Sequence, residues 1–256
     1  MSGPSDARPL QVRIADDIRA AIETGRLAPG AKLPTLEALA EEHMCSVGGV
    51  RAAVDLLKQQ GLLITRQGKG IFVRERVRAQ RHGMDRYSRS VWSAGKSILV
   101  AEAGSQGHEV DQLIRFLGIV PAPAAVAERL GIEPGDDVFV RRRTTEIDKR
   151  PNQLADSYYL PELAERVPAL TQEDTGPGGG FARIEDAGIH LARIREELAV
   201  RMPAGPEIGV LRIPEGTPVV ELTRTVRDDR GRPVEVMIAI IAGDMTAFDY
   251  EFPVPD

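Results

Sequence analysis

Residues suited to binding an anion lie in the second half of the 256-residue chain. Arg141 and Arg143 stand two residues apart in a run with strand character, which places both guanidinium groups on one face and Arg142 on the other. Two guanidinium forks on one face can bind a phosphate, sulfate or carboxylate. The alternatives are a solvated charged face or pairing with Glu146 and Asp156.

A glycine-rich segment offers a second anion-binding feature. Residues 177–181 read Pro-Gly-Gly-Gly-Phe and open a helical pattern over Phe181–Ala187. Free backbone N–H groups at a helix start attract anions, which makes Gly179, Gly180 and Phe181 candidate ligand contacts. A flexible loop with Phe181 in the core accounts for the same residues.

Metal and catalytic constellations are not identifiable in the sequence. The chain has one cysteine, Cys45, and four scattered histidines without ligand spacing. No Ser-His-Asp set or carboxylate pair is apparent, so we expect no metal, no cofactor and no enzyme activity. A lone cysteine, no secretory signal and no apolar run near eighteen residues favour a cytoplasmic protein.

Length and charge indicate two domains with different partners. Residues 1–82 contain 13 basic and 9 acidic residues, whereas the remainder contains 20 basic and 29 acidic residues. A basic first third suits a module that faces phosphates, and an acidic remainder does not.

The N-terminal elements read as three helices and a hairpin. Apolar residues recur at helical spacing over Gln11–Thr24, and Thr35 is a candidate N-cap for a second helix. After a short turn, Ser46 caps a third helix that extends to about Gln60. Strands over Leu62–Arg66 and Ile71–Val73 flank a tip rich in glycine.

This order predicts a winged helix-turn-helix, whose second helix enters the DNA major groove at its N-terminal end. A surface helical hairpin without a DNA role is the alternative. The residues expected to contact DNA lie in the helix pair and in the wing: Thr35, Ser46, Val47, Gly48, Gly49, Arg51, Arg66, Gln67, Gly68 and Lys69.

The segment resembles the DNA-binding domain of the GntR family of bacterial transcription regulators. The matches are IADxIRxxIxxGxLxPGxxLP, S…VRxAVxxLxxxGL and RQGxGxFV. Ser46, Arg51, Arg66, Gly68 and Lys69 match positions that contact DNA in the family. The family usually has arginines at positions 37 and 47 and often a threonine at 49, where this chain has Glu37, Val47 and Gly49, so the operator sequence cannot be carried over.

The region from residue 74 to residue 107 is polar, with Tyr87 and Trp92 between arginines and serines. A solvated hinge whose aromatic residues pack into the next domain is the favoured interpretation. An added contact with the DNA backbone is the alternative. The arginines of this stretch are Arg76, Arg78, Arg81, Arg86 and Arg89.

The C-terminal region alternates strands with short helices and predicts an α+β fold with an antiparallel sheet. Expected strands cover Leu113–Val120, Asp137–Glu146, Gln153–Leu160, Pro218–Asp228 and Pro233–Ala242, while Ile194–Met202 is a strand or a helix. The stretches from Leu130 and from Leu211 share a helix end, a turn, a strand, an Asp-containing turn and a Pro-led strand, which indicates an internal duplication.

This region resembles the UTRA effector-binding domain of the HutC subgroup, on the motifs VPAPAAVAERLGIEPGD, LADSYYLPELA and GTPVVELTRTVRDDRGRPVEV. The resemblance implies a chorismate-lyase-like fold that senses a small molecule in a pocket between the two hairpin units. Glu235 follows Arg-Pro-Val as the family's pocket carboxylate does, and Tyr158 is a candidate pocket wall. Thr145 stands where family members that sense phosphosugars have a second arginine.

The expected domains are a winged helix-turn-helix over 8–75, a linker over 76–91 and an effector-binding and dimerisation domain over 92–256. The expected function is a homodimeric transcription repressor that binds palindromic double-stranded DNA and is released by an anionic small molecule. The alternative is a DNA-binding protein without an effector, whose second domain only dimerises.

Overall fold

The computed structural model describes residues 8–74, 79–83, 85–213, 216–251 and 254. The chain divides into one unit of Met1–Arg76 with Ile213–Thr217 and a second of Val77–Arg212 with Pro218–Asp256. Among the described helices, none combines the length and the apolar character that a bilayer crossing requires.

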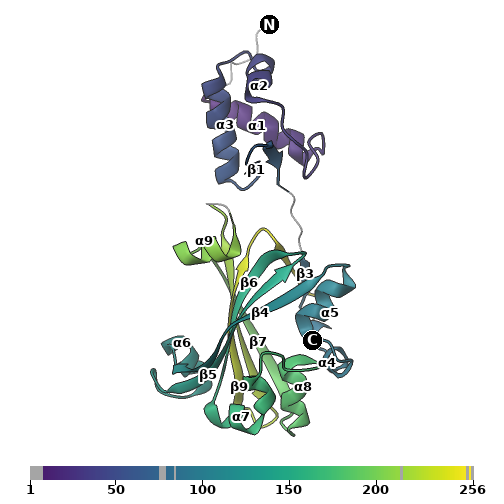
Figure 1. The fold of residues 1–256 in the computed structure, drawn as a ribbon, viewed down its shortest axis with the longest axis vertical. Helices are drawn as coiled ribbons and strands as arrows, with labels where there is room; N and C mark the ends of the chain where they lie inside the picture. Colours follow the sequence, from purple (N-terminus) through teal and green to yellow (C-terminus); the bar gives the residue numbers. More distant parts are fainter. Residues whose placement is uncertain (1–7, 75–78, 84, 214–215, 252–253, 255–256) are drawn as a thin grey trace. The chain divides into compact units, whose positions relative to one another are not determined.

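The first unit is a three-helix bundle with a hairpin. Helices α1 (Leu10–Glu23), α2 (Leu36–Glu42) and α3 (Val47–Gln59) precede strands β1 (Leu63–Arg66) and β2 (Gly70–Val73), which pair antiparallel (Figure 1). The core contains the apolar faces of all three helices, including Ile14, Leu39 and Val54. The elements match the predicted winged helix-turn-helix, and the predicted bounds of α1, α3 and the strands differ by one residue.

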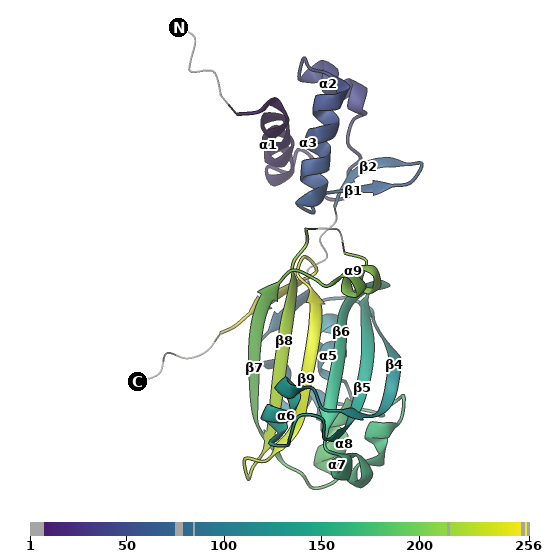
Figure 2. The ribbon, with the colours of Figure 1, turned by 90° about the vertical axis from the view of Figure 1, so that its left-hand side faces the viewer.

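The second unit is built on a six-stranded antiparallel sheet of order β4-β5-β6-β9-β8-β7, seen face-on in Figure 2. The predicted α+β fold is confirmed, and the ambiguous segment at Ile194–Met202 is a strand. The strands are β4 (Val110–Pro121), β5 (Asp137–Ile147), β6 (Arg150–Tyr159), β7 (Leu191–Arg201), β8 (Val219–Asp228) and β9 (Pro233–Ala242).

The sheet consists of two copies of one motif. In the first copy β4 leads through α6 (Ala124–Leu130) to the β5–β6 hairpin, and in the second β7 leads through α9 (Gly205–Leu211) to the β8–β9 hairpin. The copies meet where β6 pairs with β9, and β4 and β7 form the outer edges. This arrangement agrees with the internal duplication that the sequence indicates.

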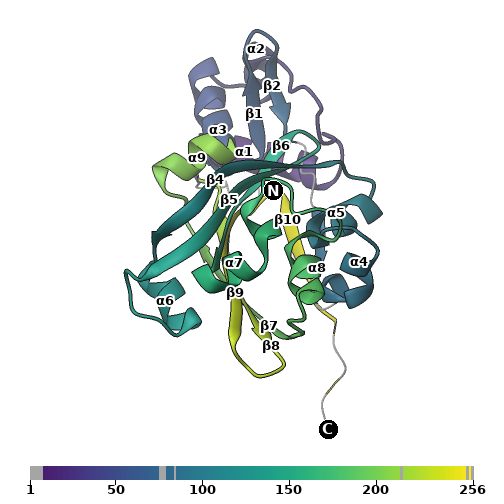
Figure 3. The ribbon, with the colours of Figure 1, turned by 60° about the horizontal axis from the view of Figure 1, so that its bottom comes forward.

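Different helices cover the two faces of the sheet (Figures 1 and 3). On one face, α4 (Arg89–Ser93), α7 (Pro161–Arg166), η2 (Pro168–Thr171) and α8 (Gly179–Asp186) enclose a core with Phe139 and Tyr159. Helix α5 (Ile98–Ser105) lies on the same side. On the other face, α6 packs against Val138, Val140 and Val236.

The polar stretch after the first unit differs from the expected solvated hinge. Strand β3 (Ala79–His82) pairs in parallel with β10 (Thr246–Asp249), and η1 (Asp85–Tyr87) follows. Arg81 and Arg86 are buried, at 3% and 6% exposure. Trp92 packs edge-on against Phe181 with ring centroids 5.5 Å apart, as expected of the aromatic residues. Arg76 and Arg78 lie outside the described residues.

Candidate functional site

The helix pair of the first unit is held by side-chain caps at both helix starts. Thr35 Oγ1 accepts a hydrogen bond of 3.2 Å from the N–H of Ala38, and Ser46 Oγ accepts one of 3.3 Å from the N–H of Gly49. Each cap satisfies a backbone donor that a helix otherwise leaves unpaired. Both N-caps agree with the sequence prediction and fix where α2 and α3 begin.

The first turn of α3 has an open surface. Gly48 and Arg51 are exposed, whereas Val47 is half-buried and packs against the core of the bundle. A Cβ at Gly48 or Gly49 would meet only ordinary contacts, such as Ser46 Oγ at 3.8 and 3.7 Å. The fold therefore does not require glycine at either position, and the missing Cβ atoms leave the backbone of this turn open to another molecule.

The wing carries a second exposed cationic surface. Arg66, Gln67, Gly68 and Lys69 are all exposed at the tip between β1 and β2. The Arg66 guanidinium lies 4.7 Å from the centroid of the Phe72 ring, a cation–π contact that orients it. Within the described part of the chain, no ion pair neutralises Arg66 or Lys69, so both charges remain available.

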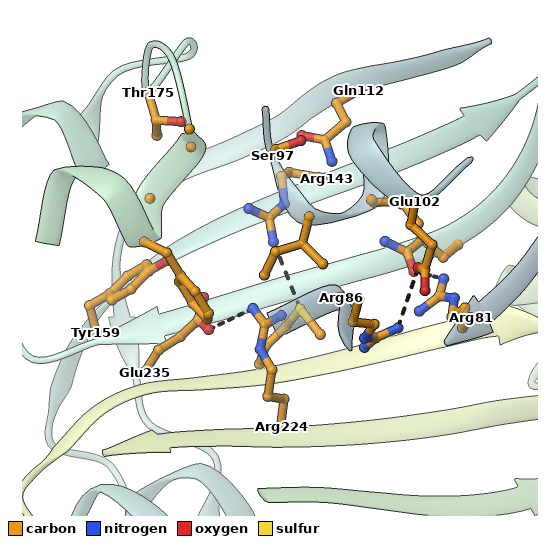
Figure 4. Close-up of a pocket in the computed structure, with 18 residues that line it drawn as sticks. Arg81, Arg86, Ser97, Glu102, Gln112, Arg143, Tyr159, Thr175, Arg224 and Glu235 are labelled. Carbon is orange, nitrogen blue, oxygen red and sulfur yellow. Dashed lines mark hydrogen bonds and ion pairs between the residues drawn. The ribbon is translucent and has the colours of Figure 1, made fainter. Parts of the chain in front are cut away.

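The second unit contains a cavity of about 110 Å³ on the face covered by α8 and α5 (Figure 4). Strands β5, β6, β8 and β9 contribute Arg143, Tyr159, Arg224 and Glu235 to its wall. Gly179, Gly180 and Phe181 also line it, so the glycine-rich segment does face a cavity.

Glu235 is the buried carboxylate of this cavity. One oxygen accepts a hydrogen bond of 2.8 Å from the Tyr159 hydroxyl, and the other lies 2.7 Å from Arg224 Nη2 (Figure 4). Burial alone would raise the pKa of Glu235, but the positive charges of Arg224 and Arg143 outweigh it and lower that pKa. Glu235 is therefore a charged, hydrogen-bonded group and not an exposed strand residue.

Arg143 is a cavity cation without a carboxylate partner among the described residues. Its Nη2 donates a hydrogen bond of 2.8 Å to Ser157 Oγ and lies 4.0 Å from Met237 Sδ. Pairing with Glu146 or Asp156, the alternative weighed for this arginine, does not occur, since Asp156 pairs with Arg115 and Arg142. Arg143 therefore lines the cavity outside any ion pair within the described residues, although its charge helps to lower the pKa of Glu235.

Arg141 has a different role from the one expected. Its guanidinium is buried and donates to the backbone carbonyls of Leu170, Gln172 and Glu173, the last at 3.1 Å. Arg141 is not among the residues that line the cavity. It holds the segment between η2 and α8 against β5. The prediction that Arg141 and Arg143 bind an anion together is therefore wrong.

Tyr158 lies on the opposite face of the sheet from the cavity. It pairs with Val140 in the β5–β6 register and packs with the cluster beneath α6. Its neighbour Tyr159 lines the cavity instead, because successive strand residues face opposite sides. The expectation of Tyr158 as a pocket wall is therefore wrong by one residue.

The start of α8 is shaped by glycine. Gly178 has φ of +79°, and a Cβ there would lie 2.4 Å from the carbonyl oxygen of Trp92. Only glycine fits this approach, which brings the first turn of α8 to the edge of the cavity. The close packing against α4 shows that the segment is built into the fold.

Several residues that line the cavity were not predicted from the sequence. Arg81, Arg86 and Glu102 come from the stretch expected to be a solvated hinge. Arg224 could have been predicted from the internal duplication. Aligning Gly135 with Gly216 places Arg224 at the position equivalent to Arg143. The same alignment, taken from Pro151 and Pro233, places Gln153 opposite Glu235.

Sequence comparisons agree with this division into two functional units. Residues 10–73 match the family of bacterial regulatory proteins called the gntR family, and residues 105–247 match the UTRA domain. An uncharacterised HTH-type transcriptional regulator of Streptomyces coelicolor is 35% identical over 97% of this chain and 93% of the relative. The probable transcriptional regulator PhnF of Escherichia coli is 27% identical over 87% of each chain.

Solved structures show the same fold. The crystal structure of a GntR-family transcriptional regulator superimposes with a TM-score of 0.66 at 26% identity, covering 97% of this chain and 99% of the other. PhnF from Mycobacterium smegmatis shares the fold, with a TM-score of 0.59 at 19% identity over 94% of this chain and all of the other. These relatives are transcription regulators and not enzymes. The chain belongs to the GntR family of bacterial transcription regulators, in the HutC-type architecture that joins an HTH DNA-binding domain to a UTRA effector-binding domain.

Proposed function

We propose that the protein is a homodimeric repressor whose affinity for a palindromic operator falls when an anionic small molecule binds the UTRA cavity. The observation that carries the proposal is Arg143, a guanidinium that faces the cavity and has no carboxylate partner within the described residues. Arg224 and Glu235 pair with one another at 2.7 Å, whereas Arg143 remains available to an anion.

The DNA contacts of the proposal come from the first turn of α3 and from the wing. Arg51 is exposed on α3, and Gly48 and Gly49 leave the backbone of this turn accessible. Lys69 and Arg66 supply phosphate contacts from the wing. The remaining members of the proposed interface are Thr35, Ser46, Val47, Gln67 and Gly68.

The effector contacts of the proposal are Arg143, Glu235 and the first turn of α8. Gly179, Gly180 and Phe181 line the same cavity as Arg143. Backbone N–H groups at a helix start favour anions, which adds to the attraction of the arginine. A cavity of about 110 Å³ holds several times the roughly 10–15 Å³ that one water needs.

A dimer would present two recognition helices to half-sites about 34–36 Å apart. Effector binding that favours another helix spacing needs a coupling of about 1–3 kcal/mol to lower operator affinity 5- to 150-fold. The coupling is reciprocal, so operator DNA would weaken effector binding by the same factor.

The experiment is a gel-shift assay with DNA from upstream of the protein's own gene, followed by a screen of anionic metabolites for release. Arg143→Met should bind the operator like the wild type but fail to respond to the metabolite. Arg142→Met, on the opposite face of β5, should respond normally. Absence of any site-specific binding at moderate salt would refute the regulator proposal, and release that persists in Arg143→Met would refute the anionic pocket.

A further inference from the structure

We propose that the UTRA cavity has a second anion subsite at Arg81, so that its ligand carries two anionic groups, one bound at Arg143 and the other at Arg81. This inference rests on the proposed function, since it extends the effector cavity described above. It identifies the ligand class as an elongated dianion, such as a dicarboxylate or a phosphorylated acid.

Arg81 is a buried cation without a counterion of its own. It lines the cavity from β3, is 3% exposed, and donates through Nη2 to the neutral amide oxygen of Gln153. Its Nε is buried without a hydrogen-bond partner, as are those of Arg86 and Arg224 in the same cavity. Burial, and then the charge of Arg86, lower the pKa of Arg81 to about 10 against the opposing negative charges of Glu102 and Glu196, so the guanidinium is still protonated at neutral pH. An anion beside it would offset both costs.

The carboxylates near Arg81 are engaged by Arg86. Glu102 Oε2 lies 3.6 Å from Arg86 Nη1, and Glu102 Oε1 accepts a hydrogen bond of 2.7 Å from the N–H of His82. Glu196 forms an ion pair with Arg86 Nη2. Four guanidinium groups and two carboxylates line the cavity, and Glu196, which pairs with Arg86 from outside the lining, brings the surplus to one positive charge. Among the described residues, the lining arginines outside any ion pair are Arg81 and Arg143.

The internal duplication explains why both arginines lack a partner. In the second copy Arg224 faces Glu235, and these two form an ion pair. In the first copy the equivalent positions are Arg143 and Gln153, so an uncharged amide stands where the second copy has its carboxylate. That amide accepts a hydrogen bond from Arg81, and Arg143 donates instead to the hydroxyl of Ser157.

The two subsites are separated along one strand. The hydrogen-bond partners of Arg81 and Arg143 are Gln153 and Ser157, four residues apart on the same face of β6. Because the two arginines take their hydrogen-bond partners from different positions along β6, a molecule with an anionic group at each end can contact both.

Gln153→Glu is the sharpest test, because it places a carboxylate where the second anionic group would bind. The probes are linear dicarboxylates from glutarate to suberate and monocarboxylates of equal chain length, titrated calorimetrically into the full-length protein. In the wild type, the best-fitting dicarboxylate should bind about 10- to 100-fold more tightly than its monocarboxylate. Gln153→Glu should raise the melting temperature of the free protein and abolish this preference.

Arg81→Met provides the complementary variant. It should also reduce the ratio of the two dissociation constants to about one, while Arg81→Lys should restore part of it. A purely structural role would weaken dicarboxylate and monocarboxylate binding equally and leave the ratio unchanged. Arg142→Met, which removes a charge from the other face of the sheet, should keep the wild-type ratio.

Equal binding of both probe classes to the wild type would overturn the proposal, as would an unchanged ratio in Gln153→Glu and Arg81→Met, or failure of every probe to bind. Inorganic phosphate distinguishes this failure from that of the proposed function. Phosphate binding that is lost in Arg143→Met supports the single-anion pocket even if the second subsite fails.

Discussion

Arg224 and Glu235 form an ion pair inside the cavity wall, with 2.7 Å between Nη2 and Oε2 and 2% exposure of the glutamate side chain. The Arg224 guanidinium also lies 4.9 Å from the Phe181 ring centroid, so the pair joins the sheet to α8. The two residues thereby connect the chemistry of the cavity with the stability of the domain.

Arg224→Met should lower the free energy of unfolding by about 3–5 kcal/mol, because it leaves Glu235 buried without its counterion. The double variant Arg224→Met/Glu235→Leu should lose less, since it removes the uncompensated charge. Urea unfolding measures both. As a control, Arg195→Met removes an exposed ion pair with Glu197 in the same unit and should cost about 0–1 kcal/mol. A double variant less stable than Arg224→Met would contradict the electrostatic explanation.

Acid should selectively weaken the domain through Glu235. Its pKa lies below the ordinary 4.5 in the folded protein, so the folded state binds this proton less tightly than the unfolded chain. The stabilisation is complete above about pH 5 and is lost as the pH falls through the depressed folded value. Urea unfolding from pH 7 to pH 3 should show the stability difference between wild type and Glu235→Gln shrinking with acidity. A difference that stays constant would exclude this linkage.

Gly48→Ala and Gly49→Ala should affect stability and DNA binding in opposite directions. Alanine should stabilise α3 by roughly 0.5–1 kcal/mol, because the added Cβ meets only ordinary contacts. If DNA approaches this turn as proposed, the same Cβ should weaken operator binding several-fold. Thermal unfolding and gel shifts report the two effects. Gly104→Ala, in open space on α5, is the matched control and should leave operator affinity unchanged.

Lys69→Ala should weaken binding to specific and unrelated DNA alike, since a lysine on the wing contacts phosphates rather than bases. The slope of log affinity against log salt should decrease in magnitude by about one. Fluorescence anisotropy at several salt concentrations measures the slope. Lys96→Ala, in the other unit, should keep the wild-type slope. A loss of affinity confined to one sequence would instead indicate base recognition by Lys69.

Local patterns predicted the first unit well. The apolar spacing of α1 and α3, the caps at Thr35 and Ser46 and the glycines of the wing are short-range features, so the sequence displays them directly. The positions of the six strands of the large sheet along the chain followed from alternation and turn residues for the same reason, with Ile194–Met202 left open between strand and helix.

The cavity was harder to predict because it depends on contacts between distant segments. Arg141 was expected in the pocket, but a loop some thirty residues later provides the carbonyls that bind it. Arg81 and Arg86 look like solvent-exposed charges in a polar stretch, but in the fold β3 pairs with β10, and the two side chains are buried against Gln153, Glu102 and Glu196. Tyr158 was assigned to the wrong face of its strand. Its pairing with Val140 places it on the face opposite the cavity.

The parallel pair of β3 and β10 joins residues 79–82 to residues 246–249, so nearly the whole UTRA domain lies between its two strands. During synthesis the N-terminal bundle can fold as soon as it leaves the ribosome. Strand β3 cannot pair until residues 246–249 have been synthesised, and such distant pairing forms slowly. The segment that follows the DNA-binding domain therefore reaches its native state only after every strand of the large sheet has been made.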